Sequence, residues 1–137
     1  MTPPNRRKAI PKELDKAEHA LASAELLLAA GQIDAALNRA YYCAFHAARA
    51  ALLTLGVQPR THQGVNQRFN LDLVVPGHVE AEYLSILGRV QTQRELADYG
   101  VDTELGPPEA ANEIAAARRF LRRIEALLRE GRWIDVP

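Results

Sequence analysis

Apolar residues recur at every third or fourth position through several long segments of this chain, and glycine or proline separates one segment from the next. This spacing places the apolar side chains on one face of an α-helix rather than of a strand. The composition agrees, because 23 alanines and 18 leucines outnumber eight valines and six isoleucines, and alanine and leucine favour helices. Two of the apolar stripes are Leu14, Ala17, Leu21, Ala24 and Leu28, and Ile114, Ala117, Leu121, Ile124 and Leu128. Each stripe needs a facing partner, so the sequence predicts an all-α fold.

The breaks predict where the helices begin and end. Pro11 marks the start of the first helix and Gly31 its end, because proline is favoured in a first helical turn and glycine just beyond a last one. Asp34 and Thr61 are residue types that cap helix N-termini. The segment 71–78, LDLVVPGH, has mixed signals and is predicted to be a loop. The predicted helices cover residues 12–30, 34–55, 62–70, 78–99 and 109–130.

The length indicates one domain. A chain of 137 residues with 47% hydrophobic content is long enough to build a single core and too short to need a second one. We expect one helical domain over residues 1–137, with its core at about 12–130, folded as an up-and-down bundle of four to five helices. The apolar tail, residues 132–137, could dock on this bundle or on a second subunit, and we expect it to dock on its own bundle.

Several classes of protein are excluded or disfavoured. Cys43 is the single cysteine, which excludes an intramolecular disulfide and a multi-thiolate metal site, and the histidines are too scattered to predict a metal centre. The sequence has no glycine-rich phosphate loop, nucleophile elbow or HExxH motif. Its longest uncharged apolar stretch, 26–33, is shorter than the about 20 residues that span a bilayer, and the N-terminal segment lacks the apolar core of a signal peptide. We therefore expect a cytoplasmic protein that needs no membrane, metal or cofactor.

The charges of the chain cancel. Seventeen Lys and Arg residues balance 17 Asp and Glu residues, so no overall field draws the molecule to nucleic acid or an anionic membrane. Fourteen of the basic residues are arginine, whose planar donor group suits phosphate and carboxylate. Heat adaptation or a GC-rich coding sequence also favours arginine over lysine. Any site for a polyanion must therefore be local.

The helix predicted over 34–55 has little surface left for water. One face is apolar and the next consists of small residues; the apolar face is Leu37, Tyr41, Ala44, Ala48, Ala51 and Leu55, and the small face is Ala36, Ala40, Cys43, Ala47 and Ala50. The remaining sector carries a row of polar side chains, Arg39, Tyr42, His46 and Arg49. Such a row can hold a phosphate and stack a base. The alternative is that Arg39 and Arg49 pair with acidic residues of neighbouring helices while Tyr42 and His46 lie at the rim.

An arginine falls within the apolar sector of the helix predicted over 78–99. Arg94 clusters on the helical wheel with Val79, Tyr83, Ile86, Leu87, Val90 and Ala97. Burying an unpaired guanidinium group is costly, and Asp98 is one turn away and within reach. One interpretation is that Arg94 and Asp98 only secure the last turn, with Tyr99 packed beside them. The other is that Arg94 lines a cleft between helices or subunits.

The helix predicted over 109–130 is rich in arginine, with Arg118, Arg119, Arg122, Arg123 and Arg129 near Glu113, Glu125 and Glu130. Guanidinium groups in such number can follow a phosphate backbone. A helix of this kind is more often a solvated face with pairs between positions i and i+4. We expect the paired, solvated face here.

Three segments, NRAYYCAFHAARAALL, THQGV and RELADYG, resemble HEPN-domain proteins, and more narrowly the small stand-alone HEPN proteins of bacteria and archaea. The resemblance covers roughly residues 12 to 130. It implies an all-helical bundle that is commonly a homodimer, often encoded beside a minimal nucleotidyltransferase in a toxin–antitoxin pair. Many such proteins are metal-independent ribonucleases, with an arginine followed after four to six residues by a histidine. Arg94 matches the arginine of that motif.

The histidine of the motif is absent, because Arg94 is followed by Glu-Leu-Ala-Asp-Tyr-Gly. An imidazole exchanges a proton near neutral pH, whereas the carboxyl of Asp98 and the phenol of Tyr99 belong to types that do so far from it. Arg39 and His46 have a similar spacing, but on a different helix. We therefore expect a nucleotide- or RNA-binding partner of a nucleotidyltransferase-like protein, with a site drawn from Arg39, Tyr42, His46, Arg49, Arg94, Asp98 and Tyr99. The alternatives are a ribonuclease toxin that uses Arg94 with His46, Asp98 or Tyr99, and a structural dimerisation module.

Overall fold

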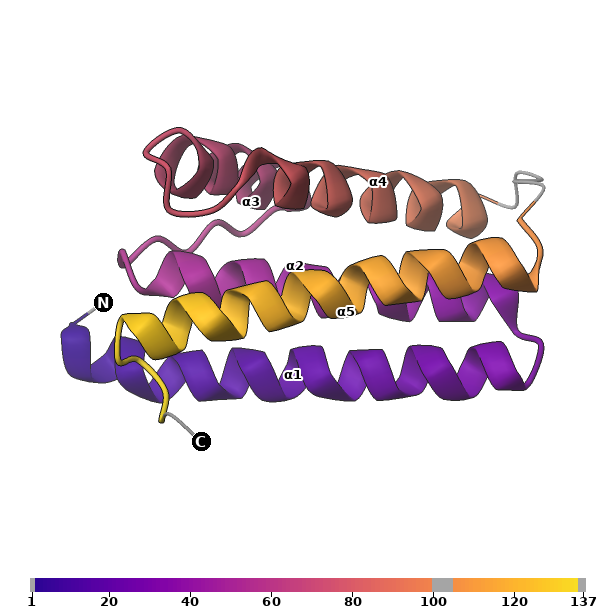
Figure 1. The fold of residues 1–137 in the computed structure, drawn as a ribbon, viewed down its shortest axis with the longest axis horizontal. Coiled ribbons are helices and arrows are strands. Elements are labelled where there is room, and N and C mark those ends of the chain that lie inside the picture. The colour runs from indigo at the N-terminus through magenta and orange to yellow at the C-terminus, as the bar shows by residue number, and fades with distance from the viewer. Residues whose placement is uncertain (1, 100–104, 136–137) are drawn as a thin grey trace.

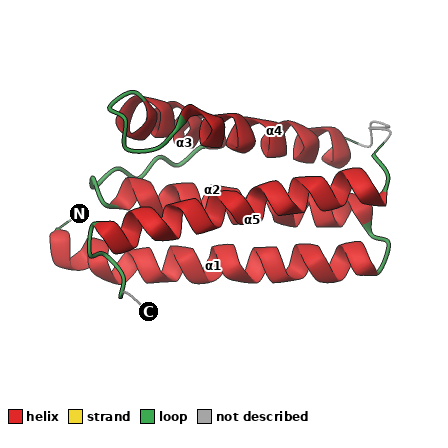
Figure 2. Cartoon of the chain, viewed as in Figure 1, coloured by secondary structure: helices red, strands yellow, loops and turns green. Residues whose placement is uncertain are grey.

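The computed structural model describes residues 2–99 and 105–135. Its helices are α1 (Pro3–Ala29), α2 (Ile33–Leu53), α3 (His62–Phe69), α4 (Ala81–Asp98) and α5 (Pro107–Glu130), with a π-helical turn, η1 (Asn70–Val74), directly after α3. The described residues contain no strand, as Figure 2 shows. The predicted all-α class is confirmed.

The four long helices run up and down, each antiparallel to the next long helix along the chain (Figure 1). α2 is the central element: it packs against α1 most extensively and also against α5, α4 and the short α3. The N- and C-terminal ends lie at the same end of the bundle. This arrangement is the up-and-down bundle of four long helices and one short one that the periodicity predicts.

The first helix begins nine residues earlier than predicted. The side chain of Thr2 caps α1 by accepting a hydrogen bond from the backbone N–H of Asn5 at 3.3 Å, and prolines occupy the first two helical positions, where an N–H would have no partner. Pro11 therefore lies inside α1 rather than at its start. It costs one backbone hydrogen bond, but the turn before it buries Ile10 completely. This apolar burial favours the longer helix.

The other boundaries agree with the prediction to within a few residues. Thr61 caps α3, and its hydroxyl accepts from the N–H of Gly64 at 2.9 Å. Asp34 is not the cap of α2; it lies in the first turn, and Gln32 occupies the cap position. α4 begins at Ala81 rather than at residue 78. Gly100, predicted to end this helix, lies outside the described residues.

The segment 71–78 is not a simple loop. The helical path of α3 continues through the π-helical turn η1 to Val74, because this path buries the side chain of Leu73 to 2% exposure. The carbonyl of Leu73 accepts hydrogen bonds from the N–H groups of His78 and Val79 at 2.8 and 3.0 Å. Gly77, with φ at +89°, makes the left-handed turn that returns the chain towards α4.

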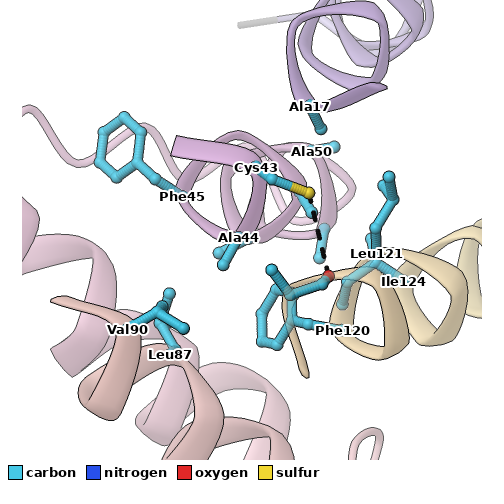
Figure 3. Packing of buried hydrophobic residues seen from close by; sticks show 14 of the residues in the cluster. Ala17, Cys43, Ala44, Phe45, Ala50, Leu87, Val90, Phe120, Leu121 and Ile124 are labelled. Atoms are coloured by element: carbon cyan, nitrogen blue, oxygen red, sulfur yellow. Dashed lines mark hydrogen bonds between the residues drawn. The ribbon is translucent and has the colours of Figure 1, made fainter. Parts of the chain in front are cut away.

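The core lies on the faces of α2 that the periodicity identified. Figure 3 shows Cys43 and Ala50 of α2 between Ala17 of α1 and the apolar side chains of α5. The thiol of Cys43 donates to the carbonyl of Ala117 at 3.8 Å, and burial raises the pKa of this thiol to about 12, so it stays unreactive. Leu55 is the exception to the predicted apolar face, because it lies beyond the end of α2 and is 46% exposed.

The C-terminal tail docks on its own bundle as far as the structure describes it. Trp133 and Ile134 pack against the core cluster. The guanidinium carbon of Arg7 lies 4.6 Å from the centre of the Trp133 ring, and Arg7 also donates to the carbonyl of Arg132 at 2.7 Å. Residues 136–137 lie outside the described part. None of the described helices combines the length and apolar character required to cross a membrane.

Candidate functional site

Five aromatic side chains gather along one edge of α2. We call them the aromatic cluster: Tyr41, Tyr42, Phe45 and His46 of α2, and His62 of α3. The ring of Phe45 lies between the two histidines, with its centre 5.3 Å from that of His46 and 5.0 Å from that of His62. Tyr41 and Phe45 are buried, whereas the other three rings are half-buried. The cluster therefore has an inner anchored part and an outer part open to a ligand.

The local sequence explains how one of these rings arrives from another helix. Gly56, with φ at +73°, turns the chain away from α2, and an extended link leads to the cap residue Thr61. His62 is the first residue of α3, so the cap fixes the place at which its ring meets Tyr41 and Phe45.

Arg94 of α4 lies against the cluster. Its guanidinium carbon is 5.0 Å from the centre of the Tyr41 ring and 5.9 Å from that of Tyr42, a favourable position for a cation over aromatic faces. Its side chain is 16% exposed, and Nη1 lies 3.2 Å from a carboxylate oxygen of Asp98. The Nε atom is buried and has no hydrogen-bond partner among the described residues. The guanidinium group thus keeps unused donor capacity at the edge of the cluster.

The hydroxyl of Tyr41 forms a short hydrogen bond with Nδ1 of His62. Burial raises the pKa of Tyr41 well above its ordinary value, although the charge of Arg94 acts in the opposite direction. Burial also lowers the pKa of His62, and the charge of Arg94 lowers it further. A protonated phenol beside a neutral imidazole is the expected pair. Because a phenol donates more readily than it accepts, Tyr41 donates to Nδ1, and Nε2 of His62 then carries the ring proton.

Arg39 also lies over an aromatic ring, with its guanidinium carbon 4.7 Å from the centre of Tyr42. Its Nε and Nη2 atoms donate to the side-chain oxygen of Asn38 at 3.0 and 2.8 Å. No carboxylate of residues 2–99 or 105–135 forms an ion pair with Arg39. Within these residues Arg39 therefore has no acidic partner, and a neutral amide and an aromatic ring contact its guanidinium group instead.

The second arginine of the row, Arg49, does have an acidic neighbour. This neighbour is Glu13 of α1: one of its carboxylate oxygens lies 2.8 Å from Nδ1 of His46 and the other lies 4.0 Å from Arg49. Burial by itself would raise the pKa of Glu13, but the nearby groups, chiefly the hydrogen bond from His46 and the positive charge of Arg49, outweigh it and lower the pKa. Glu13 is therefore an ionised carboxylate that is only 8% exposed.

Tyr99 does not join the cluster. It is the residue at the C-terminal cap of α4 and is 83% exposed, so the interpretation that it packs beside Arg94 is wrong. The structure brings together the other predicted residues of the row with Arg94 and its partner Asp98.

Sequence reasoning missed Glu13, Phe45 and His62, and it assigned Tyr41 to the core alone. An acidic residue next to Leu14 in the apolar stripe of α1 was a signal for Glu13, because a buried charge needs a partner. The cap motif beginning at Thr61 was a signal for His62, since it fixes where this ring stands.

The arginines of α5 are engaged elsewhere. Arg118, Arg119, Arg122 and Arg123 pair with Glu25, Glu82, Glu18 and Glu80, respectively. These partners lie on α1, on α4 and just before α4. Most of the pairs therefore join α5 to another segment, whereas the sequence predicted pairs between positions i and i+4 within one helix. The paired, solvated face is confirmed. None of these four guanidinium groups contacts the aromatic cluster, where cations, ring faces and imidazoles stand together, so we take the cluster as the candidate site.

The site offers ring faces, cations and imidazole nitrogens. Within the described residues, no group of three or more His, Cys, Asp or Glu side chains stands together as a metal-binding set. Ring faces bind bases, and guanidinium groups bind phosphates.

Comparison with known proteins places the chain in a family. The profile of the HEPN domain matches residues 11–131. The chain is 36% identical to "Putative toxin MJ0605" of Methanocaldococcus jannaschii over 90% of this chain and 92% of that protein, and 27% identical to "Putative toxin MJ0142" of the same organism over 89% and 83%. It is also 36% identical to "UPF0332 protein PH1297" of Pyrococcus horikoshii over 70% of each chain. The chain therefore belongs to the HEPN domain family.

Proposed function

We propose that this HEPN protein binds RNA or a nucleotide at the aromatic cluster, without cleaving it. The observation that carries the proposal is Arg94: its guanidinium group lies on the rings of Tyr41 and Tyr42, its side chain is 16% exposed, and Asp98 is its only ion-pair partner among the described residues. A phosphate oxygen is an acceptor of the charge and geometry that such a group binds.

The neighbouring side chains supply the other contacts of a nucleotide. Tyr42 is half-buried and has Arg39 over its ring, and a base stacks on a tyrosine ring or on a guanidinium plane. Because the total charge of the chain is zero, the attraction for a phosphate comes only from the cations of this site. We therefore expect a short binding site rather than a long basic track.

We further propose that the protein is a homodimer and acts in the cytoplasm as one component of a two-component, toxin–antitoxin-like module with a nucleotidyltransferase-like partner. Two relatives carry the name of a toxin, which supports membership of such a module. Co-purification of the chain with the product of a neighbouring nucleotidyltransferase-like reading frame tests the partnership, and size-exclusion chromatography with light scattering tests the dimer.

Substitution of Arg94 tests the binding site. Arg94→Ala is expected to weaken binding of a fluorescein-labelled single-stranded RNA by about 10- to 100-fold, the contribution of a hydrogen bond to a charged group. The matched control is Arg119→Ala, which removes an arginine of α5 that is paired with Glu82 in the first turn of α4. Circular dichroism checks that both variants stay folded. Equal binding by wild type and Arg94→Ala overturns the proposal; if both proteins bind nothing and the variant only melts earlier, a structural dimer is the better reading.

One observation favours ribonuclease activity as a second candidate. His62 and Arg94 both contact Tyr41, so an imidazole stands near the family's arginine although the motif histidine is absent. Incubating the protein with single-stranded RNA in EDTA tests this candidate, with Arg94→Ala, His46→Ala and His62→Ala as controls. If the wild type cleaves the RNA and these substitutions abolish the cleavage, the proposed function becomes ribonuclease activity instead of binding without cleavage.

A further inference from the structure

We infer that His46 accepts a hydrogen bond from a ribose 2′-hydroxyl, so that the site selects RNA over DNA, and that Glu13 is the positioning residue that prepares His46 for this contact. The inference rests on the proposed function, because it assumes that the aromatic cluster binds a nucleotide. It adds the class of sugar and the two residues that distinguish it.

The first step is the hydrogen bond between α1 and α2. A carboxylate oxygen of Glu13 lies 2.8 Å from Nδ1 of His46, and Glu13 is only 8% exposed. An ionised carboxylate can only accept hydrogen bonds, so Nδ1 must donate. In the neutral imidazole the proton is therefore on Nδ1, and Nε2 carries a lone pair.

The second step is that this lone pair is unused and accessible. Among residues 2–99 and 105–135, no hydrogen bond to Nε2 of His46 is formed, and this atom is not among the buried atoms that lack a partner. The cations of the site, Arg39, Arg49 and Arg94, only donate. His46 is therefore an acceptor in a site whose cations can only donate, and its ligand must offer a donor.

The third step is the order of the groups along α2. Tyr42, His46 and Arg49 follow one another on the same face of the helix, at spacings of four and three residues. The Tyr42 ring is a stacking surface for a base. The side chain of Arg49 is 29% exposed and lies as far as 4.0 Å from the carboxylate of Glu13, so it remains a cation for a phosphate. The sugar lies between base and phosphate in every nucleotide. The group between Tyr42 and Arg49 therefore meets the sugar, and the hydroxyl that donates there in RNA is absent from DNA.

Four probes of one base sequence test the inference: fluorescein-labelled single strands with ribose, deoxyribose, 2′-O-methyl ribose or 2′-fluoro ribose, all with uracil. The last two keep an electronegative atom at the 2′ position but cannot donate from it. The wild type is expected to bind the ribose strand about five- to tenfold more tightly than each of the other three, which is the effect of one hydrogen bond. His46→Phe keeps the ring and is expected to reduce the affinity for RNA to that for DNA.

Glu13→Gln tests the positioning role. An amide can donate to Nδ1 and shift the ring proton to Nε2, so this variant is expected to lose most of the preference for ribose. A residue with a merely structural role would change both affinities together and leave their ratio unchanged. The ratio is measured within one preparation, so partial unfolding of a variant does not alter it. His19→Phe, which changes an exposed histidine of α1, is the matched control and should keep the wild-type ratio.

The outcomes separate this inference from the proposed function. Equal binding of ribose and deoxyribose strands by the wild type overturns the inference, while the proposed function stands if Arg94→Ala weakens both. The inference is also overturned if His46→Phe keeps the preference for ribose. It is overturned as well if the 2′-O-methyl and 2′-fluoro strands bind as tightly as the ribose strand. If none of the four strands binds to the wild type, the inference is wrong, and so is the proposal that the cluster binds RNA.

Discussion

The guanidinium carbon of Arg94 lies 5.0 Å from the centre of the ring of Tyr41, a tyrosine that is completely buried. This contact explains how a charged residue occupies the apolar sector of α4. The ring faces of Tyr41 and Tyr42 stabilise the cation on one side, and Asp98 partly balances its charge on the other. The arginine is thus held at the boundary between the core and the open part of the aromatic cluster.

The titration of His62 is expected to report this contact. Burial and the charge of Arg94 both lower the pKa of His62, so Arg94→Gln should raise that pKa towards the ordinary value without restoring it fully. Following the imidazole carbon-bound protons by NMR during a pH titration measures the change. The matched control Arg89→Gln, on the other side of α4 and paired with Glu113, should leave the midpoint where it is. The same midpoint in wild type and Arg94→Gln would show that the cation does not act on this ring.

The stability of the protein is expected to depend on Glu13 in a pH-dependent way. The pKa of Glu13 is lowered from 4.5 in the folded state, so its contribution is present above the unfolded value and is lost as the pH falls through the folded value. Glu13→Gln should lower the free energy of unfolding by about 1–3 kcal/mol near neutral pH and by less in acid. Urea denaturation at a series of pH values measures the difference, and a difference that does not change between neutral and acidic pH contradicts the prediction.

The small face of α2 is expected to resist enlargement. Ala50 is fully buried and lies where α1 and α5 approach α2 (Figure 3). Ala50→Leu should lower the free energy of unfolding by about 1–3 kcal/mol, because extra methylene groups force neighbouring side chains or helices apart. Ala22→Leu, at an exposed position of α1, should change it by less than about 0.5 kcal/mol. Thermal unfolding followed by circular dichroism compares the two variants, and similar effects would place the close packing elsewhere.

Neighbouring residues of α5 are expected to differ strongly in their contribution to stability. Phe120 is fully buried and its ring centre is 5.3 Å from that of Phe69, so Phe120→Ala should cost about 3–5 kcal/mol. Arg119 forms an exposed pair with Glu82, and Arg119→Ala should cost less than about 1 kcal/mol. Denaturation at low and high salt distinguishes them further, because only the effect of the arginine substitution should decrease with salt. A loss of several kcal/mol in Arg119→Ala would mean that the ion pairs of α5 hold the bundle together.

Much of the fold is predictable from local pattern, as particular residues show. The stripe from Leu14 to Leu28 places α1, and Thr61 caps α3 as its residue type indicates. The misplaced elements are those in which long-range burial outweighs a local signal. Burial of Ile10 carries α1 through Pro11, and burial of Leu73 extends the helical path into η1. A proline or a mixed segment predicts a break only when no apolar side chain is buried against another element by continuing the helix.

The candidate site also has a part that the sequence predicts and a part that it does not. The row from Arg39 to Arg49 follows from the rotation of about 100° per residue along one helix, and the position of Arg94 in an apolar sector follows from the same rule. The partners of this row come from α1 and α3, as Glu13 and His62 show. Nothing in the spacing of residues within α2 indicates which residue of another helix will stand opposite.

The amino-acid sequence alone therefore determines which side chains share a face, because helix geometry is a local property of the backbone and repeats every few residues. The tertiary structure alone decides which faces meet: that Arg94 lies on Tyr41, that Tyr41 bonds to His62, and that Glu13 bonds to His46. The physical reason is that these contacts depend on how the helices pack around α2. That packing is set by burial summed over the whole core rather than by any one segment.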